Sequence, residues 1–266
     1  MIYDNVLDAM GQTPIIRLSR MNDEDSAEVL VKFEGLNVGG SIKTRTAYNM
    51  IKAAEKKGFI NQDTIIVEPT SGNQGIGLAL IGAVKGYKTV IIMPDSVSEE
   101  RRKLVRHYGA EVILVHDAGN IGECIDECLQ TALRMAKENP NVYVPQQFEN
   151  EANPKVHKHH TALEIMEQVA GGNIGTHLQM GIGDGLIPPI LNQNIYDDIC
   201  IISDEEALQT SKDLAKKEGL MCGISSGTNV AAALKLAKKL GKGKTVVTVL
   251  PDTAERYFST PLFENE

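Results

Sequence analysis

The chain has 266 residues, of which 42% are hydrophobic and 23% are charged, and its formal net charge is −8. This length and apolar content allow a substantial core, in one large domain or in two closely packed lobes. The acidic balance, with Lys and Arg scattered along helical stretches rather than gathered in a basic stripe, argues against nucleic acid as a partner. No segment approaches the ~18 consecutive apolar residues of a membrane span, and the N-terminus lacks the features of a signal peptide. We therefore expect a cytoplasmic protein with no nucleic-acid and no membrane partner.

Cysteines and histidines give no metal or redox signal. The spacing of the four cysteines fits neither a zinc ribbon nor a CxxC pair, so reduced thiols are expected. Three histidines cluster in KVHKHH, where no cysteine or carboxylate set accompanies them, and we expect solvated side chains there. The cysteines are Cys124, Cys128, Cys200 and Cys222, and the histidines are His157, His159 and His160.

Short β-branched runs alternate with amphipathic helical windows, which predicts parallel strands joined by crossover helices. The expected elements, in chain order, are strand 29–34, helix 41–57, strand 64–68, helix 73–85, strand 88–93, helix 98–108, strand 111–115, helix 119–138 and strand 141–145. A helix after residue 154, helices 204–218 and 226–240, and strand 245–250 follow. This pattern predicts an α/β fold of two interleaved lobes, a smaller one of residues 1–12 and 35–145 and a larger one of residues 13–34 and 146–266.

In an open α/β sheet, ligands bind at the carboxyl ends of the strands, so the strand-to-helix loops are the places to search for a site. The first such loop, GLNVGGSIK, delivers Lys43 to the first turn of a helix. The positive end of a helix dipole, together with burial, lowers the pKa of a lysine toward that of a nucleophilic amine. By itself this pattern is more typical of a capping serine followed by a solvated lysine.

Two further loops carry polar side chains into helix N-termini. EPTSGNQG, at residues 68–75, presents hydroxyls, amides and backbone N–H groups that suit a carboxylate or a phosphate. GISSG, at residues 223–227, opens another helix. Each loop taken singly is also explained as a polar turn with a helix cap.

The motifs GGSIKTR, EPTSGNQGIGLAL, PQQFENEANP, GISSG and LPDTAERY occur in this order, together with MGQTPIIRL and MPDSVSEERRKLVRHYGAEV. They resemble the cysteine synthase and cystathionine β-synthase family, the fold type II pyridoxal-phosphate enzymes, over nearly the whole chain. The resemblance implies two interleaved, doubly wound parallel-sheet lobes, pyridoxal 5′-phosphate as the cofactor, amino-acid substrates and a homodimer.

The same resemblance implies a role for individual residues. Lys43 would form the Schiff base and move the α-proton, Asn73 would bind the ring hydroxyl of the cofactor, and Ser225 would face the pyridine nitrogen. A neutral hydroxyl stabilises a pyridinium less than a carboxylate does, which favours loss of a β-leaving group to an aminoacrylate and attack there by a nucleophile. The substrate-binding residues would be Thr70, Ser71, Gly72, Asn73, Gln74 and Gln147.

Two side chains depart from the family pattern. Thr44 stands where the family normally has an aspartate, and Asp184, in MGIGDGLIP, stands where cysteine synthases usually have a small residue. As a catalytic base toward a second substrate, Asp184 would favour an enzyme that consumes L-cysteine, releases hydrogen sulfide and forms lanthionine or a related thioether. A solvated loop acid explains Asp184 equally well, and an O-acetylserine sulfhydrylase that synthesises cysteine remains the alternative.

A third departure lies between Leu178 and Gln179, where the family has a strand, the Gly-rich GTGGT loop for the cofactor phosphate, a helix and a further strand. Such a unit takes roughly 30 or more residues, and this sequence contains none of it. Losing central strands would cost more than the ~5–15 kcal/mol stability of a typical domain. We therefore expect the natural protein to carry this segment. A true deletion would instead predict a non-catalytic binding subunit.

Overall fold

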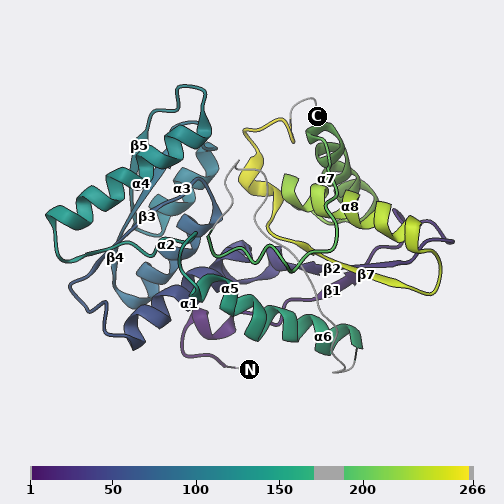
Figure 1. The fold of residues 1–266 in the computed structure, drawn as a ribbon, viewed down its shortest axis with the longest axis horizontal. Helices are drawn as coiled ribbons and strands as arrows, with labels where there is room; N and C mark the ends of the chain where they lie inside the picture. Colours follow the sequence, from purple (N-terminus) through teal and green to yellow (C-terminus); the bar gives the residue numbers. More distant parts are fainter. Residues whose placement is uncertain (1, 171–188, 264–266) are drawn as a thin grey trace. The chain divides into compact units, whose positions relative to one another are not determined.

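The computed structural model describes residues 2–170 and 189–263, and these divide into two compact units (Figure 1). The first unit contains residues 2–11, 43–163 and 189–192, and the second contains residues 12–42, 164–170 and 193–263. Residues 12, 35–42, 146–163 and 189–192 are thus assigned differently from the division expected from the sequence.

Backbone and side-chain hydrogen bonds explain these boundaries. The Ile42 N–H donates to the Pro251 carbonyl at 2.9 Å, so the chain stays with the second unit until the helix at Lys43 begins. The Asn49 amide of that helix donates to the Ala152 carbonyl at 2.6 Å, which joins the segment around Ala152 to the first unit.

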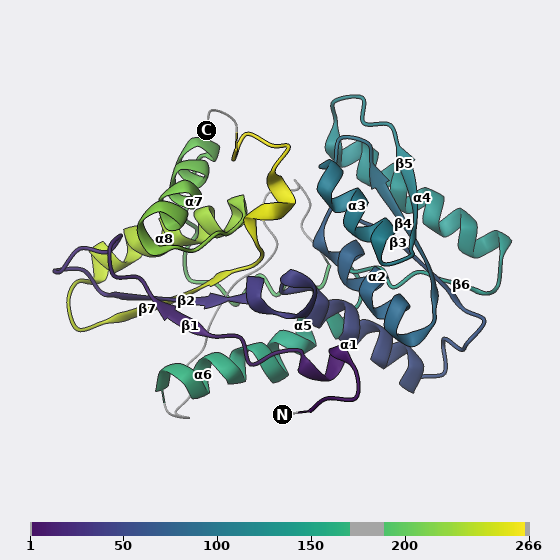
Figure 2. The same cartoon turned by 180° about the vertical axis from the view of Figure 1, so that it is seen from behind.

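A parallel sheet of four strands forms the centre of the first unit, in the order β5-β4-β3-β6. Helix α4 packs on one face of it through Cys124, Cys128 and Ala132. On the other face α2 lies close to β4, because a Cβ at Gly75 would be 2.8 Å from the Ile91 side chain (Figure 2). The elements are α1 (Lys43–Lys56), β3 (Ile65–Pro69), α2 (Asn73–Lys85), β4 (Lys88–Pro94), α3 (Glu99–His107), β5 (Glu111–Val115), α4 (Ile121–Glu138), β6 (Val142–Tyr143) and α5 (Ala152–Val156).

The helix after α5 continues as a π-helical turn, His157–Thr161, and then as α6 (Ala162–Ala170). A π-turn inserts an extra residue into the helical ladder and often marks a functional site. The sequence predicts a helix here but gives no sign of the π-turn.

The second unit is built on a three-stranded sheet in the order β1-β2-β7. β1 is antiparallel to β2, whereas β2 and β7 are parallel, with Glu28 opposite Thr245. Helices α7 and α8 bury Leu214 and Val230 against one face of this sheet. The buried Lys32 ammonium of β2 forms an ion pair with the Glu164 carboxylate of α6 at 2.8 Å. The elements are β1 (Ile15–Arg17), β2 (Glu28–Phe33), α7 (Asp204–Glu218), α8 (Ile224–Leu240) and β7 (Thr245–Leu250).

The α/β class expected from the sequence is confirmed, since helices cover both faces of a parallel sheet in the first unit and a mixed sheet forms the second. Within residues 2–170 and 189–263, every helix is too short or too polar to cross a membrane.

Candidate active site

Lys43 is the first residue of α1, and its side chain is half-buried. Helix α1 begins directly beside α2, because a Cβ at Gly77 would lie 3.1 Å from the Lys43 carbonyl oxygen. Glycine at position 77 therefore permits the close approach of the two helices. The packing brings the start of α1 next to the first turns of α2.

The loop from Thr70 to Gln74 leads from β3 into α2. The Thr70 N–H donates to the Ile92 carbonyl at 2.9 Å, and the Thr70 hydroxyl oxygen accepts the Gly72 N–H at 3.1 Å. Among the described residues, no side chain caps α2 at Gly72, and a Cβ there would meet none of their atoms within 4 Å. An uncapped helix N-terminus beside open space is suited to an anionic group.

The side chain of Gln74 is oriented by a neighbour on α1. The Thr46 hydroxyl donates to Gln74 Oε1 at 2.6 Å, and Gln74 is 1% exposed. Gln74 Nε2 is buried, and within the described residues it has no hydrogen-bond partner. A buried donor without a partner costs free energy unless a ligand accepts from it, and a substrate carboxylate would do so.

Two ionisable side chains border this loop. On α3, the Arg101 guanidinium donates to the Ser71 carbonyl at 3.2 Å, a contact that the charged pattern of α3 does not reveal. At the carboxyl end of β3, Glu68 is fully buried, and its two oxygens accept the N–H groups of Gln146 and Gln147, each at 2.8 Å. Burial raises the pKa of Glu68 to about 7, although the two hydrogen bonds oppose the rise. Gln147 is thereby tied to the strand that carries the Thr70–Gln74 loop.

His157 corrects the expectation of three solvated histidines. His159 and His160 are exposed, but His157 is half-buried in the π-turn, where its Nδ1 lies 3.0 Å from the Thr161 hydroxyl. Burial lowers the pKa of His157 to about 3, and the charges of Lys43 and Arg45 lower it further. A neutral imidazole therefore stands within electrostatic reach of the candidate lysine. The periodicity of KVHKHH cannot reveal this burial.

Three further residues were singled out by the sequence, Ser225, Asp184 and Thr44. Ser225 lies in the second unit, in the first turn of α8. Its turn packs tightly against α7, because a Cβ at Gly227 would lie 2.0 Å from the Ala207 carbonyl oxygen. Asp184 lies outside the described residues, as does the junction of Leu178 with Gln179. Thr44, where the family has an aspartate, is fully buried, and in the described part of the chain its hydroxyl has no partner.

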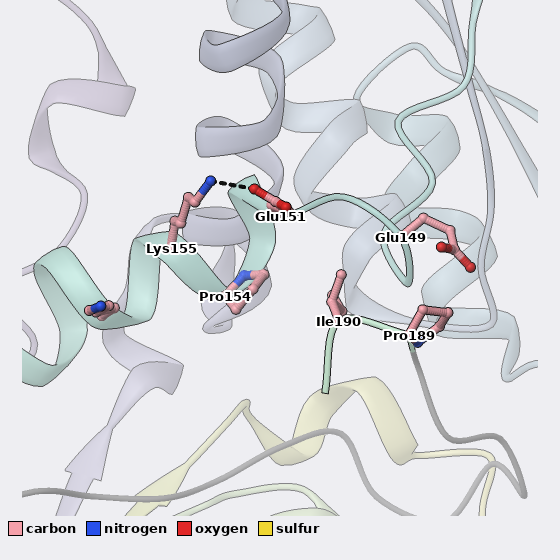
Figure 3. A pocket seen from close by; sticks show the side chains of 7 residues that line it. Glu149, Glu151, Pro154, Lys155, Pro189 and Ile190 are labelled. Atoms are coloured by element: carbon pink, nitrogen blue, oxygen red, sulfur yellow. Dashed lines mark hydrogen bonds and ion pairs between the residues drawn. The ribbon is translucent and has the colours of Figure 1, made fainter. Parts of the chain in front are cut away.

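A separate surface hollow of about 500 Å³ contains none of the predicted site residues (Figure 3). The Lys155 ammonium forms an ion pair with the Glu151 carboxylate at 2.5 Å on its wall. Such an exposed pair, one helical turn apart, is an ordinary surface feature. The residues that line the hollow are Glu149, Glu151, Pro154, Lys155, Lys158, Pro189 and Ile190.

Comparison with known proteins decides the family. The sequence pattern of the family described as pyridoxal-phosphate dependent enzymes matches residues 6–187 and 173–252. The chain belongs to this family. Its fold is that of the fold type II enzymes, it is an enzyme of the cysteine synthase type, and its cofactor is pyridoxal 5′-phosphate.

Relatives with related activities support this assignment. The cysteine synthase of Staphylococcus aureus strain Mu50 is 40% identical over 308 residues, which covers 98% of this chain and 97% of that protein. A hydrogen sulfide-producing enzyme from Fusobacterium nucleatum is 35% identical with a TM-score of 0.86, covering 96% of this chain and 100% of its own. An O-ureido-L-serine synthase is 33% identical with a TM-score of 0.88, covering 100% of this chain and 96% of its own.

The comparison also bears on the segment expected after Leu178. The alignment with the S. aureus enzyme runs over 308 positions and this chain has 266 residues, so at least 42 aligned positions have no counterpart here. The two stretches that match the family pattern overlap at residues 173–187, on either side of the expected junction. Both findings agree with a segment that the relatives have and this sequence lacks.

The described residues fit the amino-acid end of the cofactor site. The orphaned Gln74 donor, the open space beside Gly72 and the uncapped start of α2 form a polar cradle next to the helix that Lys43 begins. Such a cradle suits a carboxylate close to a lysine-bound cofactor. The individual roles of Lys43, Thr70, Ser71, Gly72, Asn73, Gln74, Gln147 and Ser225 stay predictions.

Proposed function

We propose that this enzyme catalyses β-elimination and β-replacement on L-cysteine. One cysteine loses hydrogen sulfide from Cβ, and the sulfur of a second cysteine bonds to the same carbon, which gives lanthionine. The observation that carries the proposal is Asp184, an acid among glycines, together with the likeness to the hydrogen sulfide-producing enzyme of F. nucleatum. Asp184 would accept the proton of the incoming thiol.

This proposal gives each predicted site residue a role. Pyridoxal phosphate, held by Lys43, supplies the electron sink for chemistry at Cα and Cβ. The Lys43 amine removes the proton from Cα, and the neutral imidazole of His157 adds no positive charge beside that amine. The substrate carboxylate is held by Thr70, Ser71, Gln74 and Gln147, Asn73 orients the cofactor ring, and Ser225 faces its nitrogen.

The cysteine synthase relatives favour a second candidate, synthesis of cysteine from O-acetylserine and sulfide. Incubation with L-cysteine alone separates the two. Sulfide and lanthionine in about a 1:1 ratio would support the first function. Activity only with O-acetylserine plus sulfide would support the second.

Replacement of Asp184 tests the residue on which the choice depends. The variant Asp184→Asn should lower lanthionine formation from L-cysteine by about 100-fold, the usual loss when a general base is removed. The exposed acid Asp198 supplies the control, and Asp198→Asn should keep full activity. Wild-type product ratios in Asp184→Asn would show that Asp184 is a solvated loop acid.

We also propose a homodimer, which sedimentation of the natural protein would test. The cytoplasmic location expected from the sequence stays a prediction. A non-catalytic binding subunit remains the outcome if the natural chain truly lacks the segment after Leu178, and the mass of the intact natural protein decides this.

A further inference from the structure

The loop that carries Gln147 leaves the sheet before it reaches that residue. β6 pairs with β3 only through Ile65 opposite Val142 and Ile66 opposite Tyr143. Beyond Tyr143 the backbone is no longer paired with β3. The Glu68 carboxyl group, near the end of β3, instead accepts the N–H groups of Gln146 and Gln147.

The backbone at Gln146 is built for this contact. Its φ is 53°, in the left-handed region that costs a non-glycine residue about 1 kcal/mol or more. A left-handed residue turns successive N–H groups toward one side, a concave arrangement that binds anions. Here the anion is an internal carboxylate, so formation of the two hydrogen bonds offsets the cost of the turn.

Glu68 also lies two residues before Thr70. One side chain therefore joins the loop from Thr70 to Gln74 with the loop that carries Gln147. Both oxygens of Glu68 are occupied by backbone N–H groups and the residue is fully buried, so it is not placed to exchange protons with a substrate.

We propose that Glu68 is a positioning residue that holds Gln147 in register with the Thr70–Gln74 loop, so that both reach the same substrate carboxylate. This proposal rests on the proposed function of these loops. The other side-chain bonds to this segment come from neutral amides, those of Asn150 to the Pro145 carbonyl at 2.9 Å and of Asn153 to the Gln147 carbonyl at 2.8 Å. Within the described residues, Glu68 contacts this segment through an ionisable carboxyl group that accepts two N–H groups at once, and such hydrogen bonds to a carboxylate are the stronger kind.

The variant Glu68→Gln tests the proposal, because it keeps the size of the side chain but presents an NH₂ group to one of the two N–H donors. With the amino-acid substrate that the wild type turns over, we expect KM to rise about tenfold while kcat changes less than about threefold. Glu68→Asp retains the charge with a shorter reach and should show a smaller rise in KM. If Glu68→Gln does not fold, the same comparison is made with Glu68→Asp.

Glu218 offers a matched control. Its carboxylate also accepts loop amides, those of Ser19, Arg20 and Met21, and no residue of the candidate site belongs to that loop. Glu218→Gln should lower stability without changing KM. Equal KM values in the wild type and both Glu68 variants, or an equal shift in Glu218→Gln, would overturn the proposal.

Amide hydrogen exchange provides a readout that does not depend on turnover. Exchange at Gln146 and Gln147 should accelerate at least about tenfold in Glu68→Gln and stay unchanged in Glu218→Gln. If the wild type turns over no β-substituted alanine, the proposed function fails. The exchange measurement would still report on the hydrogen bonds from Gln146 and Gln147 to Glu68. Unchanged exchange in Glu68→Gln would show that Glu68 does not hold the backbone at Gln146 and Gln147.

Discussion

Lys43 is the residue on which the enzyme assignment makes its most direct prediction. Lys43→Ala removes the amine that would hold pyridoxal phosphate, so the purified protein should lose its visible absorbance and at least about 100-fold of its activity. Lys56→Ala, which changes an exposed lysine in the last turn of the same helix, serves as the control. A coloured and active Lys43→Ala protein would contradict the assignment.

His157 makes a prediction about acid stability. Its pKa is lowered from 6.5 to about 3, so between pH 3 and pH 6.5 the imidazole is protonated in the unfolded chain and neutral in the folded protein. Folding stability therefore decreases as the pH falls below 6.5. His157→Gln removes this contribution, and its free energy of unfolding should fall about 1–2 kcal/mol less than that of the wild type between pH 7.5 and pH 5.

Urea unfolding of both proteins at the two pH values measures this difference. His160→Gln, which changes an exposed histidine three residues away, should reproduce the pH dependence of the wild type. If the free energies of unfolding of His157→Gln and of the wild type change equally between pH 7.5 and pH 5, the imidazole is protonated in the folded protein.

At the scale of elements, the contact of α7 with α8 depends on one glycine. A Cβ at Gly227 would lie 2.0 Å from the Ala207 carbonyl oxygen and 2.9 Å from the Ser211 nitrogen, both backbone atoms. Gly227→Ala must separate the helices and should cost about 2–4 kcal/mol of stability. It would also displace the turn that carries Ser225.

Gly122 is the matched control, since it is also a helical glycine but its added Cβ would meet only the Asn120 side-chain oxygen at 3.5 Å. Gly122→Ala should be neutral or stabilising, because alanine favours the helix. Thermal melts of both variants make the comparison, and equal melting temperatures would show that the crossing of α7 and α8 adapts.

Elements with strong local signals were predictable from the sequence. The bounds of α2, α7 and β7 agree with those expected, because hydrophobic periodicity and a terminal glycine or a β-branched run mark their ends. β1 was not expected, since three residues leave no period, and β6 is shorter than expected because its pairing with β3 ends at Tyr143.

The candidate site was predictable only in part. The loops that contain Lys43 and Thr70–Gln74 are visible because glycines, hydroxyls and a helix start occur together. Glu68 and His157 gave no signal, since the burial of one and the π-turn of the other arise from tertiary contacts between segments distant in the chain. Their roles emerge from hydrogen bonds to Gln146 and Gln147 and from the charge of Lys43.

At the scale of the whole molecule, the sheet of the second unit has an unprotected edge strand. In its described part, β7 pairs only with β2, although its sequence TVVTVL contains no charge, proline or other device that protects an edge strand. Apolar side chains in the segment before α7 are also exposed, Ile199 by 70% and Ile201 by 87%. An unpaired parallel strand of this composition is a site for pairing or aggregation.

The segment that the relatives have offers an explanation for this open edge. We predict that inserting the corresponding segment of the S. aureus cysteine synthase between Leu178 and Gln179 raises the melting temperature by more than about 5 °C, because strand pairing would cover β7 and bury apolar surface. The insertion should also increase the affinity for pyridoxal phosphate, measured by fluorescence titration. A glycine- and serine-rich insert of equal length is the control, since it adds chain without strands. Equal melting temperatures and cofactor affinities for the 266-residue chain and both insertion variants would mean that the segment contributes neither to stability nor to cofactor binding, and that β7 is a tolerated edge.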